Sequence, residues 1–384
     1  MKNNRIDWSH LNTLFLREGE LRFANTMIRQ IQEGNINKDN FSLGGLWKAM
    51  GEPRINDEMA RMGQFLREAD IREAMDSSAF PKITGALINS VIQEAYDIYT
   101  GVGDNLVRKI PSTQQDDTIV GFTSIDQVEE VVQGGPYPEG SYGEKYHKIR
   151  NRKFGKLIGV TAEMIKFDQT GQMIMRAQDI GNKAASKHEE IIMRAICESA
   201  STGPYASWRP NGTSTALYSD TSTDPYSGAT LDNSITDKLA DETDLDSAFT
   251  NFATFKDETG DYLQINPDSF LCGPATIGVA RKIAFSQQYT PTSTPAGVPK
   301  PARYTFSPYS SPWVGGLLGS PYWLFGEFTK QFVLTQIFPL EVFQEKANSP
   351  SEFERDVLYR FKTRFMEGCG AITNRYVIRS TGAS

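Results

Sequence analysis

The sequence predicts an α+β fold with one long helix, one long hairpin and several short strands. Three observations support this prediction. Apolar residues recur at intervals of three and four over residues 170–202, as on one face of a helix. Residues 110–160 show the alternation of paired strands on both sides of a glycine-proline cluster. Residues 357–365 alternate between apolar and basic side chains, as in a strand with one buried face.

Length and composition exclude several classes of protein. At roughly 150 residues per domain, the 384 residues suggest two or three structural units. A hydrophobic share of 39% with 11% aromatic residues is enough for a sizeable core, so wholesale disorder is excluded. No stretch approaches the roughly 20 apolar residues of a membrane span, and no apolar segment follows Met1 as in a signal peptide.

Charge and cysteine content exclude further classes of protein. The formal net charge is −7, which argues against a protein coated with nucleic acid because such binding needs clustered positive charge. The three cysteines lie far apart in the sequence, so we expect neither a disulfide framework nor a zinc module. This cysteine usage fits a reducing compartment.

The first 80 residues are predicted to be mostly helical. One helix should run from about Leu11 to Ile31 and a second from about Asn56 to Met75, because apolar residues recur at helical spacing in both. After Pro81 and Gly85, which mark a boundary, the pattern predicts another helix over residues 87–99.

The hairpin predicted over residues 112–156 has its tip near residues 134–143, and its two arms carry opposite charge. The first arm contains six acidic residues and no basic one: Asp116, Asp117, Asp126, Glu129, Glu130 and Glu139. The returning arm contains six basic residues: Lys145, Lys148, Arg150, Arg152, Lys153 and Lys156. Opposite charges across paired strands contribute about 0.2–1 kcal/mol per pair. Because a lone hairpin is only marginally stable in water, we expect this one to lie on another surface.

The helix over residues 171–202 is the clearest predicted element. It should be long, because an α-helix rises by about 1.5 Å per residue. Gly203-Pro204 should end it. Residues 204–236 read as an irregular loop, and an acidic helical segment follows between Asp237 and Asp261.

The last part of the chain should contain mostly strands. Residues 266–283 predict a turn, a buried strand and a helix led by Pro274, and residues 291–321 predict a loop. Strands are expected at residues 322–325, 332–334 and 357–365, then a turn at Gly368-Cys369-Gly370 and a final strand at residues 375–379.

The sequence offers little chemistry. There are three histidines, and neither a Gly-x-Ser-x-Gly elbow nor a phosphate-binding loop is present. His188 lacks a second histidine at metal-ligand spacing, so we expect it to pack on the helix. Cys272 should be a buried structural thiol, and the pairs Asp116-Asp117 and Asp257-Glu258 should be solvated. We therefore predict no catalytic residues, no cofactor and no metal site.

Several motifs then show a resemblance. The stretch Lys153-Phe154-Gly155-Lys156-Leu157-Ile158-Gly159-Val160-Thr161-Ala162-Glu163-Met164-Ile165-Lys166-Phe167-Asp168, which leads into the long helix, resembles the return of the extended loop in tailed-bacteriophage major capsid proteins. Residues 131–140 are similar to the tip of that loop, residues 266–282 to the strand and helix of the axial domain, and residues 353–378 to the closing strands of the peripheral domain. The order of these motifs over residues 81–384 carries the resemblance.

The resemblance implies a Hong Kong 97-like (Johnson) fold with a division of the chain into six parts. These are an N-terminal arm or lobe (1–80), an N-terminal helix of the peripheral region (81–111), the extended loop (112–160), a peripheral domain with the spine helix (161–230), the axial domain (231–345) and peripheral closing strands (346–384). The first 80 residues are either an arm or an assembly-scaffolding segment that is later removed.

The resemblance also implies a function and partners. The chain is expected to be a major capsid protein that forms hexamers and pentamers in the icosahedral or prolate head of a phage, assembled in the host bacterial cytoplasm. Its other expected partners are the portal, scaffold or decoration proteins, and the enclosed double-stranded DNA, which it would not bind sequence-specifically. No membrane partner is expected.

Contacts between subunits are expected where charge is concentrated. The candidate residues are Lys145, Lys148, Arg150, Arg152 and Lys153 of the hairpin and Asp241, Asp244 and Asp246 of the acidic segment. The hairpin's own acidic arm competes with that segment as the partner of the basic residues. Two alternatives stay open: an encapsulin-like nanocompartment shell protein, and an enzyme whose unrecognised site uses Asp116, Asp117 or His188.

Overall fold

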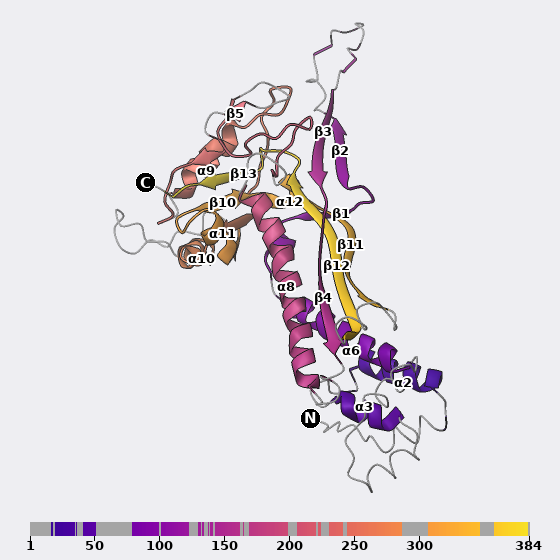
Figure 1. Ribbon diagram of the computed structural model, residues 1–384. Helices are drawn as coiled ribbons and strands as arrows, with labels where there is room; N and C mark the ends of the chain where they lie inside the picture. The colour runs from indigo at the N-terminus through magenta and orange to yellow at the C-terminus, as the bar shows by residue number, and fades with distance from the viewer. Residues whose placement is uncertain are drawn as a thin grey trace. The chain divides into compact units, whose positions relative to one another are not determined.

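The computed structural model describes a set of segments separated by gaps. They are residues 17, 20–34, 36, 41–50, 79–99, 101–122, 130–131, 133, 137, 139–140, 143–161, 164, 169–198, 206–219, 222–223, 230–240, 244–285, 306–345 and 357–382. Helices and strands are mixed along the chain, which confirms the predicted α+β class (Figure 1). The chain divides into two compact units: unit 1 contains Met1–Thr100, Lys153–Ser186 and Pro339–Phe365, and unit 2 contains Gly101–Arg152, Lys187–Phe338 and Met366–Ser384.

Helices dominate the described part of unit 1. They are α2 (Glu20–Gln32), α3 (Leu43–Met50), α6 (Ala79–Ile98) and the first part of α8 (Thr170–Ile196). Helix α2 packs on α6, and Phe23, Met27 and Ile31 lie on its buried face at intervals of four residues. The helix predicted over residues 56–75 lies outside the described residues, and α3 was not predicted.

Helices α6 and α8 approach each other closely at Gly181. A Cβ atom at this position would lie 2.5 Å from the carbonyl oxygen of Ile92 and 2.7 Å from the Cβ of Ala95. Any side chain there would therefore push the two backbones apart. At the start of α8, the Thr170 hydroxyl oxygen accepts the Leu43 N–H at 2.9 Å, which satisfies an N–H of the first turn of α3.

Two helices have ends that differ from the prediction. Helix α6 begins at Ala79, so Pro81 and Gly85 lie inside it and do not mark a boundary. Proline is tolerated in a first turn because the N–H groups there have no helical partner. Helix α8 ends at Ile196, not at residue 202. Glu198 takes a left-handed φ of 50°, and its carboxylate accepts the N–H groups of Leu217 and Tyr218, which draws the chain out of the helix.

A four-stranded sheet has the order β1-β11-β12-β4. Its strands are β1 (Arg108–Pro111), β11 (Phe332–Gln344), β12 (Val357–Ala371) and β4 (Arg152–Thr161). The predicted alternation in the last part of the chain is confirmed in β12, where Phe361 and Phe365 are buried. The predicted turn at residues 368–370 is wrong, because these residues continue the strand.

The glycines of that segment serve close packing in place of a turn. A Cβ atom at Gly368 would lie 2.6 Å from the carbonyl oxygen of Arg150, and one at Gly370 would lie 3.1 Å from the carbonyl oxygen of Ser207. The absence of a side chain thus lets β12 lie against neighbouring backbone.

A five-stranded sheet in unit 2 has the order β7-β13-β10-β8-β9. Its strands are β7 (Ser234–Ile235), β13 (Val377–Ser380), β10 (Trp323–Gly326), β8 (Ser269–Cys272) and β9 (Ser307–Ser310). Phe270, Trp323 and Phe325 are fully buried in this sheet, and the rings of Phe270 and Trp323 stack at 5.4 Å between centroids. The core of unit 2 is therefore aromatic.

Unit 2 also contains short helices. They are η2 (Gly103–Asn105), α9 (Asp244–Thr254), α10 (Ile277–Phe285), α11 (Pro312–Leu317) and α12 (Phe328–Gln331), and a small ribbon pairs β5 (Ser222–Thr223) with β6 (Thr230–Leu231). The amphipathic helix predicted in the acidic segment is confirmed as α9, which buries Leu245, Ala248 and Phe252.

Two further predictions in this region are corrected. The helix after β8 begins at Ile277 and not at Pro274, because a hydrogen-bonded turn from Gly273 to Thr276 comes first. The described part of the loop predicted over residues 291–321 contains a strand and a helix, β9 and α11. Parallel pairing with β8 makes β9 a strand, since its own Ser-Pro-Tyr-Ser sequence has little strand character.

The described residues include no helix that is long and apolar enough to span a membrane. All three cysteines are free thiols, with Cys197 and Cys272 buried and Cys369 partly buried. Burial raises the pKa of Cys197 to about 12 and raises the pKa of Cys272 and Cys369 as well. The prediction that Cys272 is a buried structural thiol is confirmed.

Candidate functional site

The predicted hairpin is present as an antiparallel pair of strands (Figure 1). Strand β2 (Asp116–Phe122) pairs with β3 (Glu144–Arg150). Most of the described residues between the strands are exposed, and Tyr137 is 86% exposed. The two-stranded part ends at Arg150, not at Lys156, because the bases Arg152, Lys153 and Lys156 lie on β4 of the four-stranded sheet.

The described residues of the two strands show one ion pair between the arms. In the register of β2 and β3, Asp116 lies opposite Arg150, whereas Asp117 lies opposite Ile149 and Thr118 opposite Lys148. The Arg150 Nε lies 3.8 Å from an Asp116 oxygen, and both side chains are about half exposed. An exposed pair of this kind contributes only about 0–1 kcal/mol, so it does not hold the hairpin in place.

Asn151 fixes the base of the hairpin. This residue is fully buried, and its side-chain nitrogen lies 2.7 Å from an Asp117 carboxylate oxygen and 2.8 Å from the Gln114 carbonyl oxygen. The Thr335 hydroxyl lies 2.7 Å from the Asn151 side-chain oxygen. The backbone N–H of Asn151 donates to the Gln115 carbonyl at 2.7 Å. One asparagine thus connects the chain before β2, the end of β3 and strand β11.

A buried ion-pair cluster connects the hairpin with the rest of unit 2. The Lys145 Nζ lies 2.9 Å from a Glu258 carboxylate oxygen, and Arg375 Nη1 lies 2.7 Å from the same oxygen. The side chains of Glu258 and Arg375 are each 7% exposed. Burial opposes ionisation of Glu258, but the hydrogen bond from Lys145 and the charge of Arg375 outweigh it and lower the pKa of Glu258 to about 2. The prediction that Asp257-Glu258 is solvated is therefore wrong for Glu258.

The loop that carries Glu258 is itself braced. A carboxylate oxygen of Asp257 accepts the N–H groups of Thr259 and Asp261, each at 2.9 Å. Such an aspartate turn fixes the loop between α9 and β8. The acidic segment was predicted as a partner of the hairpin bases, and one such pair, Lys145 with Glu258, lies inside a single chain. Glu258 was not among the candidate contact residues.

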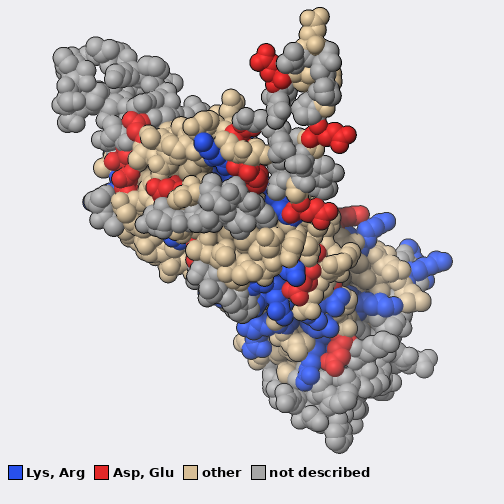
Figure 2. Space-filling view, turned by 90° about the horizontal axis from the view of Figure 1, so that it is seen from above, with Lys and Arg blue, Asp and Glu red and all other residues tan. Residues whose placement is uncertain are grey.

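The other predicted contact residues have different surroundings. Lys148 and Lys153 are exposed, and Lys148 lies over the ring of Tyr146. Burial lowers the pKa of Arg209, and the charges of Arg150 and Arg152 lower it further. Figure 2 shows that Lys and Arg side chains gather on part of the molecular face that it draws.

The acidic candidates lie at the start of α9 and before it. Asp244 lies in the first turn of α9, where a negative charge is favourable, and it accepts the N–H of Ala240 at 2.5 Å. Asp246 lies in the same turn, and Asp241 lies outside the described residues. Whether these acids meet a second subunit remains a prediction.

A second buried polar cluster surrounds His188. Its Nδ1 lies 2.8 Å from a Glu367 oxygen of β12, and its Nε2 lies 2.9 Å from an Asp104 oxygen of η2. The Lys109 Nζ lies 2.9 Å from the other Asp104 oxygen. The next residue, Glu189, accepts the N–H groups of Val102 and Gly103. The expectation that His188 packs on the helix therefore misses its two carboxylate partners.

These contacts determine the protonation of the cluster. Burial by itself lowers the pKa of His188, but the hydrogen bonds to Asp104 and Glu367 outweigh it and raise the pKa to about 9. The hydrogen bond from His188, with Lys109 adding to it, lowers the pKa of Asp104 to about 2. Burial raises the pKa of Glu189. His188 is consequently an imidazolium at neutral pH.

In both clusters the described carboxylates contact basic side chains. No group of three or more potential ligands able to hold a metal ion occurs among the described residues. The residues of the enzyme alternative have separate partners: Asp116 contacts Arg150, Asp117 contacts Asn151, and His188 contacts Asp104 and Glu367.

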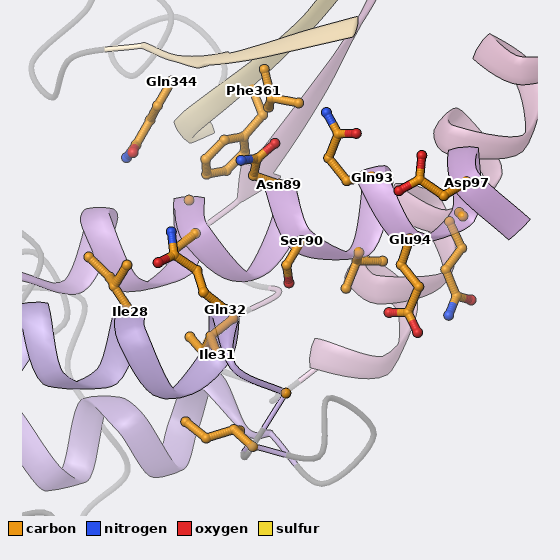
Figure 3. A pocket seen from close by; sticks show the side chains of 18 of the residues that line it. Ile28, Ile31, Gln32, Asn89, Ser90, Gln93, Glu94, Asp97, Gln344 and Phe361 are labelled. Atoms are coloured by element: carbon orange, nitrogen blue, oxygen red, sulfur yellow. The ribbon is translucent and has the colours of Figure 1, made fainter.

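A hollow of about 1440 Å³ lies in unit 1 between residues of α2, α6, α8, β11 and β12 (Figure 3). Amide side chains such as Gln32, Asn89, Gln93 and Gln344 line it, together with the carboxylates of Glu94 and Asp97. The described residues that line the hollow include no histidine or cysteine. The hydroxyl of Ser90 donates to the Leu87 carbonyl of its own helix.

Comparison with known proteins identifies the family. The family model described as "Phage capsid protein" matches residues 147–379, which is more than half of the chain. The chain belongs to the phage capsid protein family. The match begins in β3 of the hairpin and includes α8, α9 and the strands as far as β13.

Several solved structures are similar to this capsid protein at low sequence identity. Gordonia phage Cozz has 10% identity and a TM-score of 0.43, and the alignment covers 73% of this chain and 86% of that one. The capsid of a native GTA particle has 11% identity and a TM-score of 0.46, with 74% and 91% covered. The capsid of Cyanophage P-SCSP1u has 11% identity and a TM-score of 0.48, with 73% and 88% covered. No curated protein matches the sequence.

The family assignment confirms the predicted class and role. The capsid protein has the α+β, Hong Kong 97-like fold, with α8 as its long helix. It is a structural protein of the virion that self-assembles into the capsid shell. The comparisons give no support that would favour the nanocompartment alternative.

Proposed function

We propose that this capsid protein builds the head of a tailed phage by placing the hairpin β2–β3 of each subunit on an adjacent subunit. The observation that carries this proposal is the hairpin itself. Its base is fixed by Asn151, while the described residues toward its tip, such as Tyr137, are strongly exposed. Exposed aromatic side chains on a projecting ribbon are typical of a contact surface.

The charges of the hairpin support a polar contact with the neighbour. Lys145 contacts the buried side chain of Glu258 in its own chain. We assign the contact between subunits to the exposed Lys148, Arg150 and Lys153 and to the partly exposed Arg152. Their proposed partner is an acidic surface of the next copy, with Asp241, Asp244 and Asp246 as the candidates. Each exposed pair contributes about 0–1 kcal/mol, but a closed shell repeats the contact in every subunit.

The remaining parts of the proposal rest on the family. The subunits form hexamers and pentamers in the host bacterial cytoplasm, and the resulting icosahedral or prolate shell encloses double-stranded DNA. The portal and scaffold or decoration proteins are its further partners. The division into arm, extended loop, peripheral and axial domains, with the limits given by the sequence, belongs to the same proposal.

The double substitution Arg150→Glu and Arg152→Glu tests the contact. We expect the variant to fold but to form far fewer particles, because like charges would then face the acidic neighbour. Negative-stain electron microscopy and sedimentation of the purified protein measure particle formation.

Arg176→Glu with Lys183→Glu provides the control, since both residues are exposed on α8 and the change in net charge is the same. Normal particles from the hairpin variant would refute the contact. If both variants lose particles to the same extent, the change in net charge explains the loss.

A further inference from the structure

We propose that the Asp104–His188–Glu367 cluster is a pH-sensitive clasp that holds the start of the hairpin segment on α8 and β12. The cluster joins three elements that lie far apart in the sequence. His188 is in α8, Asp104 is in η2, which directly precedes β1 and the hairpin, and Glu367 is in β12. All three residues lie within unit 2.

The clasp is sensitive to pH because the number of N–H donors on the imidazole ring changes with protonation. A protonated imidazole donates from both ring nitrogens, whereas a neutral one donates from one nitrogen and accepts at the other. His188 has a carboxylate at each nitrogen, 2.8 Å and 2.9 Å away. Loss of the proton therefore breaks one of the two hydrogen bonds in either tautomer and directs a lone pair at a carboxylate oxygen.

The charged residues that are described next to His188 and Asp104 belong to the same unit. Glu367 faces His188 from β12, Asp104 faces it from η2, and Lys109 of β1 faces Asp104. Glu189 of α8 accepts the Val102 and Gly103 N–H groups and is coupled electrostatically to both His188 and Asp104. The imidazolium thus offsets a group of carboxylates, and its neutralisation leaves them with Lys109 as their described basic neighbour.

The position of the clasp indicates what it controls. Two consecutive residues of α8 hold one turn of chain: His188 binds the Asp104 side chain and Glu189 binds the backbone of Val102 and Gly103. Strand β1 begins at Arg108, four residues after Asp104. Opening the clasp would free the turn that leads into β1 and from there into β2.

The direction of the pH effect follows from linkage. Because the cluster raises the pKa of His188 above its ordinary value of 6.5 to about 9, its stabilisation is complete below pH 6.5 and is lost as the pH rises through 9. The relevant pH range is therefore mildly alkaline.

The test compares the full-length protein with His188→Gln in thermal unfolding at fixed protein concentration, from about pH 6 to about pH 10. A glutamine amide donates but does not titrate. We expect the wild-type midpoint to exceed that of the variant at pH 6 and the two curves to converge by pH 10. Parallel curves would overturn the proposal.

Two further variants keep the test decisive. Asp104 is half exposed, so Asp104→Asn should fold, and we expect it to move the alkaline loss to lower pH. His147 is also buried but stacks on Trp208, and His147→Gln serves as the matched control. A pH curve flattened equally by His147→Gln and His188→Gln would contradict the clasp.

Hydrogen exchange gives a local readout that a general loss of stability would not reproduce. At neutral pH we expect His188→Gln to speed exchange several-fold in the peptide that contains Val102 and Gly103, with much less change in the peptides of β8 and β10. If exchange in His188→Gln rises equally throughout unit 2, His188 stabilises the unit as a whole and does not form a local clasp.

Discussion

Glu258 holds two cations from distant parts of the chain with one carboxylate. Lys145 comes from the hairpin and Arg375 from the segment before β13, and both contact the same Glu258 oxygen. A buried pair is not in itself strongly stabilising, because removing the charges from water has a large cost. Removing one partner of such a pair is strongly destabilising, since the other charge is then left buried without compensation.

We therefore expect Glu258→Gln to lower the free energy of unfolding by about 3–5 kcal/mol. The neutral amide would remove the charge of Glu258 from its contact with the Arg375 guanidinium, which is 7% exposed. Denaturant unfolding followed by circular dichroism measures the change.

Glu345→Gln is the control for this substitution. Glu345 pairs with Arg360 at 3.8 Å, and both side chains are about one-third exposed. The same chemical change should cost no more than about 1 kcal/mol there. A small loss in Glu258→Gln, equal to that of the control, would mean that the buried pair has no special role.

At the scale of elements, α6 and α8 depend on a glycine for their packing in unit 1. Gly181 lies in the middle of a 27-residue helix, where glycine is unfavourable by about 1 kcal/mol relative to alanine. The close approach of Ile92 and Ala95 explains its presence, because backbone and Cβ atoms there cannot move aside as a flexible side chain could.

Gly181→Ala should consequently destabilise the protein by about 1–3 kcal/mol, the usual cost of overpacking. Gly171→Ala in the first turn of the same helix is the control, because nothing lies within 4 Å of the added Cβ atom. There we expect a small gain in stability from helix propensity. Thermal unfolding of both variants measures the effect, and a stabilised Gly181→Ala would contradict the packing argument.

The whole molecule contains two units, and the substitutions Gly181→Ala and Glu258→Gln lie in different units. Gly181 belongs to unit 1 and Glu258 to unit 2, and their contacts involve different residues. The effects of independent sites add within about 0.3–0.5 kcal/mol.

The double variant Gly181→Ala with Glu258→Gln should therefore lose the sum of the two single losses. Equilibrium denaturation of the wild type, both single variants and the double variant completes the cycle. A double variant that is much more stable than the sum predicts would reveal coupling between the two units.

Periodicity predicted the elements whose burial repeats regularly. Helices α8 and α9 and strand β12 each have one apolar face, so their existence could be derived from spacing alone. The hairpin was predicted from alternation and a glycine-proline cluster. The family emerged from the order of motifs, none of which is specific alone.

The contacts that hold the site together could not be predicted in this way. Lys145 and Glu258 are 113 positions apart, and His188 and Glu367 are 179 apart. Nothing local distinguishes Glu258 from its solvated neighbours, because its burial comes from the packing of two distant segments. The glycines at 368 and 370 were misjudged for the same reason, since the backbone that they approach belongs to other elements.

The burial of the thiols has a practical consequence for chemical labelling. All three native cysteines resist ionisation at neutral pH because burial disfavours their thiolates. A cysteine substituted for Tyr137, which is 86% exposed, would be the one readily alkylated sulfur of each subunit. Fluorophores or affinity tags could then be attached once per subunit without first removing the native cysteines.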